Sequence, residues 1–328
     1  MISVIIPAYN AEKTLPDCLE ALKNQSLIPQ EIIVVDDGST DRTAQVAKGF
    51  NVIVISQPNQ GPAAARNAGI AQSCGDILLF TDSDCIPDAF WVERMVVAFT
   101  NPVVDGVKGV YRTHQSEVAA RLVQMEFEDR YRLLSRSGWI DFVDGHAAAF
   151  RREAVLQIGG FDPAFPEANN EDVDFSYRLA AAGKRMVFRP DAIVYHRHPD
   201  SFWKYFKVKI KRGYWRMIVY KQHPGKAIRD SYTPQVMKFQ ILFIYAAAAA
   251  LFLSLITPHA LWGVGLSLIF FILSIAPFFR FVERSDPRLA ILGPWFILVR
   301  AVAFSLGILG GLAGMLAFRF KLSPGKPS

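Results

Sequence analysis

The chain has 328 residues, a formal net charge of +6, and 51% hydrophobic residues. This length allows one sizeable domain plus an appendage, and the hydrophobic share is high for a wholly soluble protein. The three cysteines, Cys18, Cys74 and Cys85, have unrelated spacings that form neither a zinc motif nor an even disulfide set. We therefore expect reduced, partly buried thiols.

The first half of the chain alternates short β-rich runs with helical stretches. We expect strands at residues 2–6, 31–35, 52–55 and 77–80, each ending in a polar turn. Helices are expected at 12–24, from 40 or 41 onward, through 66–71, and at 89–99. This alternation predicts an α/β fold with a mostly parallel sheet and helices on both faces. Because ligands of such sheets bind beyond the carboxyl ends of the strands, the polar turns mark the candidate site.

Two pairs of carboxylates follow predicted strands. Asp36 and Asp37 come directly after residues 32–35, where a carboxylate can accept hydrogen bonds from a ribose or a base edge, or can cap the next helix. Asp82 and Asp84 follow residues 77–80. Since alternate residues of an extended segment point the same way, both of the latter carboxylates can face one cation. Oxygen ligands of this kind suit Mg²⁺ or Mn²⁺.

Further candidate residues lie downstream. A helix expected to open at residues 170–174 carries Glu171, Asp172 and Asp174 in its first turn, more carboxylates than capping requires. One of them is a candidate general base for a hydroxyl nucleophile. His196 follows a strand-like run at 192–194 and is a candidate metal ligand, phosphate donor or structural histidine. P-loop, G-x-S-x-G and G-x-G-x-x-G fingerprints are absent from the sequence, which argues against ATPase, esterase and Rossmann-cofactor functions.

Residues 200–238 are basic and aromatic. Ten lysines and arginines are opposed only by Asp200 and Asp230, and Trp203 and Trp215 are among the interleaved aromatic residues. Such a composition can indicate nucleic-acid binding, but its position just before an apolar block favours the headgroup zone of an anionic leaflet. A solvated helix face would explain the lysines but not the tryptophans. We expect a membrane partner and no nucleic acid.

Three apolar blocks follow, at residues 239–256, 261–279 and 289–318. The first two approach the roughly 20 residues that cross a bilayer core, and the third exceeds this length. The turn at 258–259 lacks Lys and Arg, whereas Arg280, Arg284 and Arg288 place the next loop inside. Arg300 interrupts the third block, and one full crossing would leave a basic tail outside, namely Arg319, Lys321 and Lys326. An interfacial or re-entrant start at 289–299 would avoid placing Arg300 in the bilayer, but it would not bring the basic tail inside. We expect three spans.

The N-terminal run at 2–6 is too short for a signal peptide and lacks its basic leader. We therefore expect a multi-pass protein of the inner (plasma) membrane with its N-terminal domain in the cytoplasm. The expected organisation is a catalytic domain at 1–200, an interfacial segment at 201–238, and transmembrane helices at 239–320.

Five motifs in the first part of the chain occur in a distinctive order. They are SVIIPAYN at 3–10, VVDDGSTD at 34–41, GPAAARNAG at 61–69, DSD at 82–84, and ED at 171–172. In these motifs the chain resembles family 2 glycosyltransferases of the GT-A fold, over roughly residues 1–200. The resemblance implies an enzyme of the hexosyltransferase type that transfers a sugar, with inversion, from a nucleotide diphosphate sugar. A divalent cation would stabilise the departing diphosphate.

The resemblance also implies residue roles. Asp172 would be the general base, and Asp84 with His196 would hold Mg²⁺ or Mn²⁺. Asp36 or Asp37 would contact the nucleotide, Arg66 would help to enclose the donor, and Asp82 would lie near the sugar. The implied substrate-binding residues are Pro7, Ala8, Tyr9, Asn10, Asp36, Asp37, Arg66, Asp82 and Glu171.

Two features bear on the acceptor. Processive polysaccharide synthases of this family carry Q-x-x-R-W, which the nearest stretch, residues 211–215, does not match. Polyprenyl-phosphate glycosyltransferases act on an anionic phosphate and have little need of a base, so Glu171 and Asp172 favour a hydroxyl acceptor on a lipid-linked saccharide or glycolipid at the cytoplasmic membrane face. The alternatives are a polyprenyl-phosphate sugar synthase, a processive polysaccharide synthase, a nucleotidyltransferase and an inactive membrane scaffold.

Overall fold

The computed structural model describes residues 1–165, 167 and 169–317. Within these residues the chain forms two compact units. The first comprises residues 1–114, 131–198 and 230–232, and the second comprises 115–130, 199–229 and 233–317. Residue 318 of the third predicted apolar block and the basic residues Arg319, Lys321 and Lys326 lie outside the described part of the chain.

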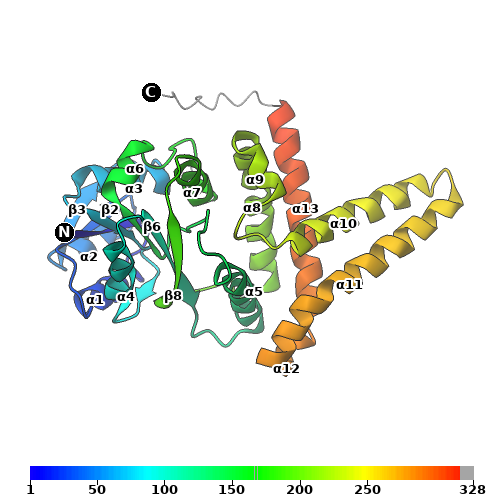
Figure 1. Cartoon of the computed structure of the whole chain (residues 1–328), viewed down its shortest axis with the longest axis horizontal. Helices are drawn as coiled ribbons and strands as arrows, with labels where there is room; N and C mark the ends of the chain where they lie inside the picture. Colours follow the sequence, from blue (N-terminus) through cyan, green and yellow to red (C-terminus); the bar gives the residue numbers. More distant parts are fainter. Residues whose placement is uncertain (166, 168, 318–328) are drawn as a thin grey trace. The chain divides into compact units, whose positions relative to one another are not determined.

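A mixed sheet forms the centre of the first unit (Figure 1). In the described residues its strand order is β3-β2-β1-β4-β7-β6-β8-β5. The pairs β3-β2, β2-β1, β1-β4 and β6-β8 are parallel, and β4-β7, β7-β6 and β8-β5 are antiparallel. The strands are β1 Ile2–Ala8, β2 Glu31–Asp36, β3 Ile53–Ser56, β4 Ile77–Phe80, β5 Ile86–Pro87, β6 Gly106–Arg112, β7 Ala148–Arg151 and β8 Met186–Tyr195.

Helices cover both faces of this sheet, and Figure 1 shows α3 and α6 on one side with α1 and α4 on the other. Helix α3 packs on β1 and β2, whereas α4 packs on β6, β7 and β8. The helices of this unit are α1 Leu15–Lys23, α2 Thr43–Lys48, α3 Pro62–Gln72, α4 Trp91–Val96 with the 3₁₀ turn η1 Val97–Thr100, α6 Arg152–Gln157 and α7 Glu171–Ala181.

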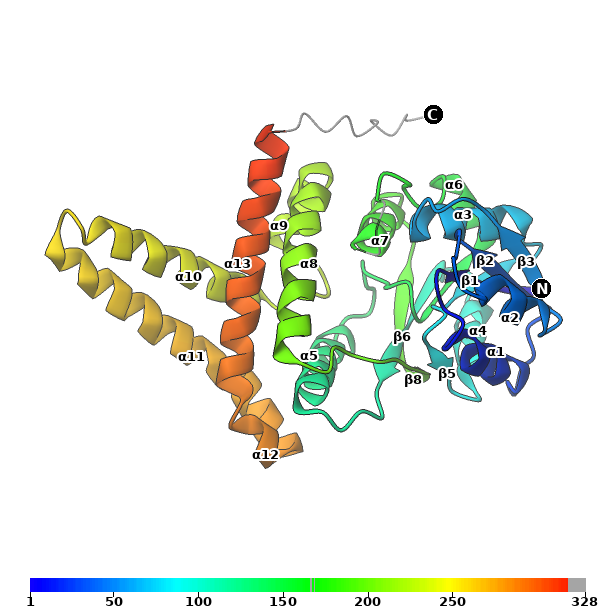
Figure 2. The same cartoon turned by 180° about the vertical axis from the view of Figure 1, so that it is seen from behind.

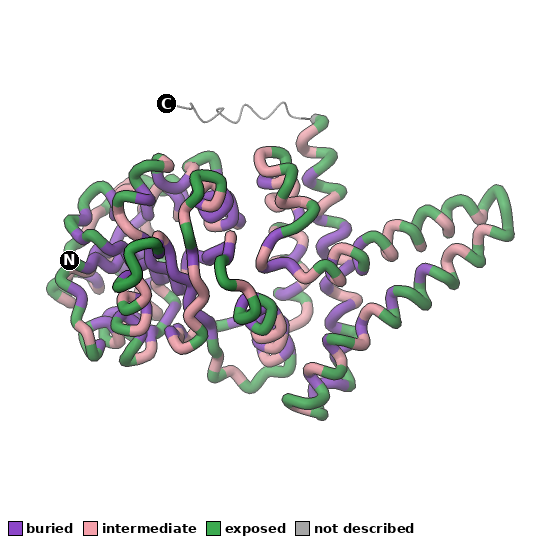
Figure 3. Tube along the Cα trace, in the orientation of Figure 1, coloured by how far each residue is buried: buried purple, intermediate pink, exposed green. Residues whose placement is uncertain are grey.

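Burial of the strands explains why β1, β2 and β4 were recognisable in the sequence, whereas the apolar run of β3 is exposed or half-buried. All four residues of β4 are buried, as are the central residues of β1 (Figure 3). Strands covered on both faces read as continuous apolar runs, and the predicted strands at 2–6, 31–35, 52–55 and 77–80 are confirmed as β1 to β4. The α/β fold with helices on both faces is likewise confirmed, although β7 enters the sheet antiparallel between β4 and β6.

Strand β6 carries a buried lysine that fixes a loop of the site. The Lys108 side chain is fully buried, and its ammonium group donates a hydrogen bond to Asp144. Its nitrogen also lies 5.2 Å from the ring centre of Tyr111 and 5.5 Å from that of Phe142. A buried lysine is tolerated only when it is paired. The pair therefore fastens residues 141–147, which precede β7, to the sheet.

The second unit is helical. Three of its helices are long and apolar enough to cross a membrane by length and composition, at Gln235–Leu253, Pro258–Ser285 and Gly293–Leu316. Helices α10 and α11 form an antiparallel hairpin (Figures 1 and 2), in which Phe243 stacks on Phe270. The elements are α5 Val118–Leu134, which enters both units, α8 Phe202–Gln222, α9 Pro224–Ile228, α10 Gln235–Leu253, η2 Pro258–Ala260, α11 Leu261–Ser285, α12 Pro287–Ala290 and α13 Gly293–Ala317.

Candidate active site

The loops after β1, β2 and β4 meet at one edge of the sheet because these three strands are parallel neighbours. Pro7 and Ala8 are the last residues of β1. Tyr9 follows and is 52% exposed. The backbone N–H of Asn10 donates to Ser39 Oγ at 2.9 Å, while its Oδ1 accepts from the N–H of Thr40 at 2.8 Å. The first two motif loops are thus joined by side-chain hydrogen bonds.

Asp36 and Asp37 are both buried but differ in how much of their acceptor capacity is used. Asp37 accepts from Gln57 Nε2 at 2.7 Å, from the N–H of Gln60 at 3.0 Å, and from the N–H of Gly61 at 2.8 Å. It therefore closes the loop that leads into α3. Within the described residues the Asp36 carboxylate accepts only from the N–H of Ser39, at 3.1 Å. The carboxylate with capacity left for a ligand is Asp36.

The sequence predicted that Asp82 and Asp84 lie on an extended segment, and the structure contradicts this prediction. Ser83 and Asp84 form a turn, closed by the N–H of Cys85 donating to Asp82 O at 3.1 Å. The turn sends the two carboxylates to different partners. Asp82 lies 3.0 Å from Arg66 Nη2 and 3.2 Å from His146 Nε2, whereas Asp84 faces His196.

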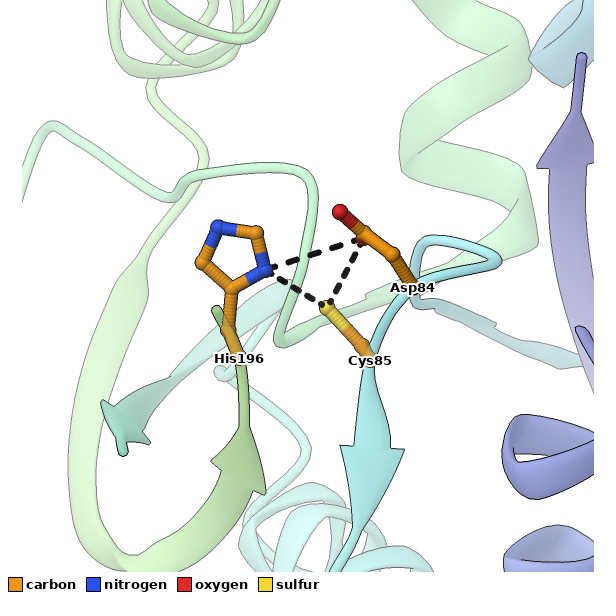
Figure 4. Close-up of side chains that lie close together, drawn as sticks. All are labelled: Asp84, Cys85 and His196. Carbon is orange, nitrogen blue, oxygen red and sulfur yellow. Dashed lines mark hydrogen bonds and ion pairs between the residues drawn. The ribbon is translucent and has the colours of Figure 1, made fainter. Parts of the chain in front are cut away.

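Asp84, Cys85 and His196 bring three potential ligand atoms together (Figure 4). His196 Nδ1 lies 3.6 Å from Asp84 Oδ1 and 3.6 Å from Cys85 Sγ. Burial alone would raise the pKa of Asp84, but the hydrogen bond from His196 and the nearby charges of His196 and His146 lower it to about 2. Burial raises the pKa of the Cys85 thiol well above its usual value, which makes it a poor ligand in the thiol form. The carboxylate and imidazole are donors that suit Mn²⁺ or Mg²⁺.

Arg66 is the buried centre of the site. Its side chain is 2% exposed, and it bonds Glu171 Oε1 through Nη1 at 2.8 Å and Asp82 Oδ1 through Nη2 at 3.0 Å. The guanidinium also lies 5.4 Å from the ring centre of Phe161. Two carboxylates on one planar guanidinium compensate its desolvation. Arg66 therefore links α3, the turn after β4 and the start of α7.

The acidic cluster at the start of α7 resolves into three different environments. Glu171 is buried against Arg66, and burial together with the neighbouring Asp172 carboxylate raises its pKa to about 7 despite that pairing. Asp174 is buried in an ion pair with Arg178 at 2.8 Å. Asp172 forms no ion pair within the described part of the chain. Its Oδ2 accepts from the N–H of Gly145 at 3.3 Å and its Oδ1 from its neighbour Val173.

Sequence reasoning missed His146. Its Nε2 contacts Asp82 Oδ2, and its ring centre lies 5.2 Å from those of His196 and Tyr111. The preceding Gly145 has no room for a side chain, because a Cβ there would lie 2.8 Å from Arg66 Nη2. The loop fastened by Lys108 and Asp144 thus contacts both Asp82 and Asp172. No motif marks it in a single sequence, since the residues that His146 contacts lie at least 35 residues away along the chain, as Tyr111 does.

The predicted site residues thus form two groups in the described residues. Arg66, Asp82 and Glu171 are joined directly, with Asp84 and His196 adjacent through the turn and His146. The nucleotide-side residues predicted at 7–10 and 36–37 are joined to one another and not to the first group. Both groups lie at the carboxyl ends of the parallel strands.

Comparisons with known proteins indicate the family of the chain. Residues 3–159 match the family model for glycosyl transferase family 2. The chain is 32% identical over 210 residues to glycosyltransferase AglE of Haloferax volcanii, an alignment that covers 60% of this chain and 66% of that protein. It is 30% identical over 246 residues to a pre-mycofactocin glycosyltransferase of Mycobacterium tuberculosis, covering 69% and 48%. The chain thus spans about half to two thirds of the length of these relatives.

A solved structure matches nearly the whole chain. It is the mannosyltransferase PcManGT from Pyrobaculum calidifontis, with a TM-score of 0.62 and 20% identity over 95% of this chain and 86% of that one. At this level of identity the likeness concerns the fold. Together with the family match, it shows that residues 3–159 belong to a glycosyl transferase family 2 domain with the GT-A fold, which is followed in the chain by helices that are long and apolar enough to cross a membrane.

Proposed function

We propose that the chain transfers a sugar, with inversion, from a nucleotide diphosphate sugar to a hydroxyl of a lipid-linked saccharide or glycolipid at the cytoplasmic face of the inner (plasma) membrane. The observation that carries this proposal is the environment of Asp172. Of the three carboxylates that open α7, Glu171 and Asp174 are buried in ion pairs, whereas Asp172 is half-buried and bonded only to backbone N–H groups in the described residues. It is the carboxylate free to accept a proton.

On the donor side, the geometry favours Asp36 over Asp37 as the nucleotide contact, because the Asp37 carboxylate is occupied by the loop before α3. Tyr9 and Asn10 would flank the nucleotide from the neighbouring strand end. Arg66 and Asp82 would border the sugar, and Glu171 would hold Arg66 in place. All of these residues follow, or pack beneath, the carboxyl ends of β1, β2 and β4.

Asp84 and His196 would hold a divalent cation. The structure of PcManGT, which has a similar fold, was solved in complex with GDP-Man and Mn²⁺. The oxygen and nitrogen donors of Asp84 and His196 suit Mn²⁺ or Mg²⁺. Such an ion, when bound, neutralises the charge that develops on a departing diphosphate. The acceptor hydroxyl would lose its proton to Asp172 as its oxygen bonds to the anomeric carbon and the bond to the diphosphate breaks. The reaction then requires a base and a cation on opposite sides of the sugar.

The membrane setting supports a lipid-borne acceptor. Three helices after the catalytic residues are long and apolar enough to cross a membrane, and α8 carries many lysines and aromatic residues. A polyprenyl phosphate is the alternative acceptor. It is already an anion and needs no general base. The effect of removing the Asp172 carboxylate therefore distinguishes the two acceptors.

We predict that transfer requires a divalent cation and is lost in Asp84→Ala. Removal of this carboxylate leaves His196 as the remaining predicted ligand. Transfer of labelled sugar by detergent-solubilised protein would be measured with Mn²⁺, Mg²⁺ or excess chelator, and folding would be checked by circular dichroism. The exposed Asp17 on α1 provides the matched control, Asp17→Ala. Full turnover in excess chelator would rule out the metal site.

We predict that His146→Ala weakens the apparent affinity for Mn²⁺ by about 10- to 100-fold, as for other residues that orient metal ligands. The reason is its contact with Asp82 and its ring packing against His196. A titration of transfer rate against Mn²⁺ concentration measures the effect. His259→Ala, in the turn between α10 and α11, serves as control. An unchanged Mn²⁺ dependence in His146→Ala would remove this histidine from the site.

We predict that Asp172→Asn lowers transfer by at least about 100-fold, the lower end of the cost of losing a general base. The variant keeps the size of the side chain and can still accept from Gly145, so affinity for the nucleotide sugar should stay near that of the wild type. Donor binding by calorimetry and transfer to lipid extracts would be measured together, with Asp17→Asn as control.

Near-normal transfer by Asp172→Asn would contradict a hydroxyl acceptor. In that case, analysis of the labelled product should show the sugar on a lipid phosphate, as the polyprenyl-phosphate alternative requires. Under the proposed function the label appears instead in a lipid-linked saccharide or glycolipid, and the two products are distinguished by the mass of the labelled lipid.

A further inference from the structure

Helix α8 cannot cross the membrane, because both of its ends lead back to the first unit. The chain leaves that unit after His198 and returns to it at Asp230. The return is firm: Ser231 donates through its N–H to Asp141 Oδ1 at 2.8 Å, and the ring of Tyr232 stacks on Phe142 at 4.1 Å. Only residues 223–229 separate the end of α8 from this anchor. Even fully extended they would span about 25 Å, less than a hydrocarbon core of about 30 Å.

Helix α13 runs along α8 in backbone contact. A Cβ on Gly307 would lie 2.2 Å from Ile210 O, and a Cβ on Gly213 would lie 3.2 Å from Gly307 Cα. Nearer the start of both helices, Tyr205 stacks on Phe296 with ring centres 4.6 Å apart. Towards their ends, a Cβ on Gly311 would meet Tyr214 O at 2.7 Å. Because the contacts advance in the same direction along both helices, α13 must share the orientation of α8.

Buried charges reinforce this pairing. Arg300 of α13 donates to Glu126 of α5 at 3.4 Å and to Gln240 of α10 at 2.7 Å. Glu126 also pairs with Arg130 at 2.6 Å and with Lys209 of α8 at 2.9 Å. If α13 crossed the membrane, Arg300 would lie about 10 Å along the helix from its start, at 1.5 Å per residue, and so within the bilayer. The charged partners on α5 and α8 would have to enter the hydrocarbon with it, at a cost of several kcal/mol.

The hairpin of α10 and α11 contacts α13 near the hairpin base. Met237 and Ile241 pack on Phe304, and the hydroxyl of Tyr245 donates to Ser305 O at 2.8 Å. From residue 246 to 253, α10 is exposed or half-buried. Figures 1 and 2 show the hairpin projecting away from α13, whereas a bundle of three spans would have its helices side by side.

We propose that, among the helices that the structure describes, only the α10–α11 hairpin crosses the bilayer, and that α8 and α13 form an interfacial pair on the leaflet from which the hairpin starts. The apolar residues that α13 leaves exposed would dip into that leaflet, namely Trp295, Leu306, Leu309, Leu312 and Leu316. This arrangement differs from the expectation of three spans, since Gly293–Leu316 is also long and apolar enough to cross a membrane. With the hairpin as the crossing element, Arg280 and Arg284 near the end of α11 return to the side from which α10 starts, as the positive-inside tendency requires.

The lipid partner of this pair is anionic. Trp203, Lys204, Lys207 and Lys211 are exposed on α8 at spacings of three and four residues, which places Lys204, Lys207 and Lys211 on one face of the helix. The ring of Trp203 stacks on Phe206 and lies 5.1 Å from the ammonium group of Lys207. Lysines with an exposed tryptophan match a negatively charged headgroup layer. The inference does not depend on the sugar, the acceptor or the reaction.

Two matched pairs of spin-labelled cysteines test the proposal. Leu309→Cys and Leu316→Cys lie seven residues apart on α13, as do Leu266→Cys and Leu273→Cys on α11, and all four positions are exposed. The full chain, with Cys74→Ser to remove its exposed thiol, would be reconstituted into vesicles of phosphatidylethanolamine and phosphatidylglycerol. Electron paramagnetic resonance with oxygen and a nickel chelate as relaxants then gives the depth of each label.

Seven residues of a spanning helix differ in depth by about 10 Å. The α11 pair should show this difference, and the α13 pair should show one common, shallow depth. A depth difference of about 10 Å in the α13 pair would overturn the interfacial assignment. A common depth in the α11 pair would overturn the spanning hairpin. Circular dichroism of each labelled protein establishes that it is folded.

Discussion

The catalytic unit depends on one buried guanidinium. Arg66 lies within the structure on α3 and holds Glu171 at the start of α7 and Asp82 in the turn after β4. A lone buried arginine would be costly, and either carboxylate alone would be repelled from the apolar interior around Phe161. Together they form an ion-paired bridge between Asp82 and Glu171, which lie more than 80 residues apart in the sequence. The turn after β4 and the start of α7 are therefore fixed relative to each other by electrostatics as much as by the sheet.

This bridge explains why neighbouring carboxylates have different properties. Glu171 and Asp82 form ion pairs with Arg66. Near them in the sequence, Asp172 accepts from the N–H of Gly145 and Asp84 lies beside His196. Asp84 lies beside His196 with a lowered pKa, as suits a metal ligand, and Asp172 keeps a carboxylate without an ion-pair partner in the described residues. In both acidic motifs one residue pairs with Arg66, and the other is the residue for which we propose a chemical role. The loop of Gly145 and His146 contacts both, anchored by the buried pair of Lys108 and Asp144.

Much of this could be predicted from the sequence. Strands buried on both faces give continuous apolar runs, so β1, β2 and β4 and the polar turns after them were recognisable. Strand β3 was recognisable as an apolar run although it is not buried, and the motif order indicated the family. What could not be predicted depends on long-range contacts. Lys108 has no apolar pattern to mark it as a core residue, His146 has no motif, and the turn at Ser83 replaces the extended segment assumed for Asp82 and Asp84. Nor does the composition of α13 reveal its backbone contact with α8, because a glycine-rich apolar helix resembles a membrane span.

The most direct test of the Arg66 bridge is a double-mutant cycle between Asp82 and Glu171, which share this arginine. The kcat/KM of sugar transfer would be measured for Asp82→Asn, Glu171→Gln, the double variant and the wild type. Residues coupled through a shared partner show interaction energies of about 0.5–3 kcal/mol, and the bridge predicts a value in this range. Effects that add to within about 0.3–0.5 kcal/mol, as for independent sites, would contradict it.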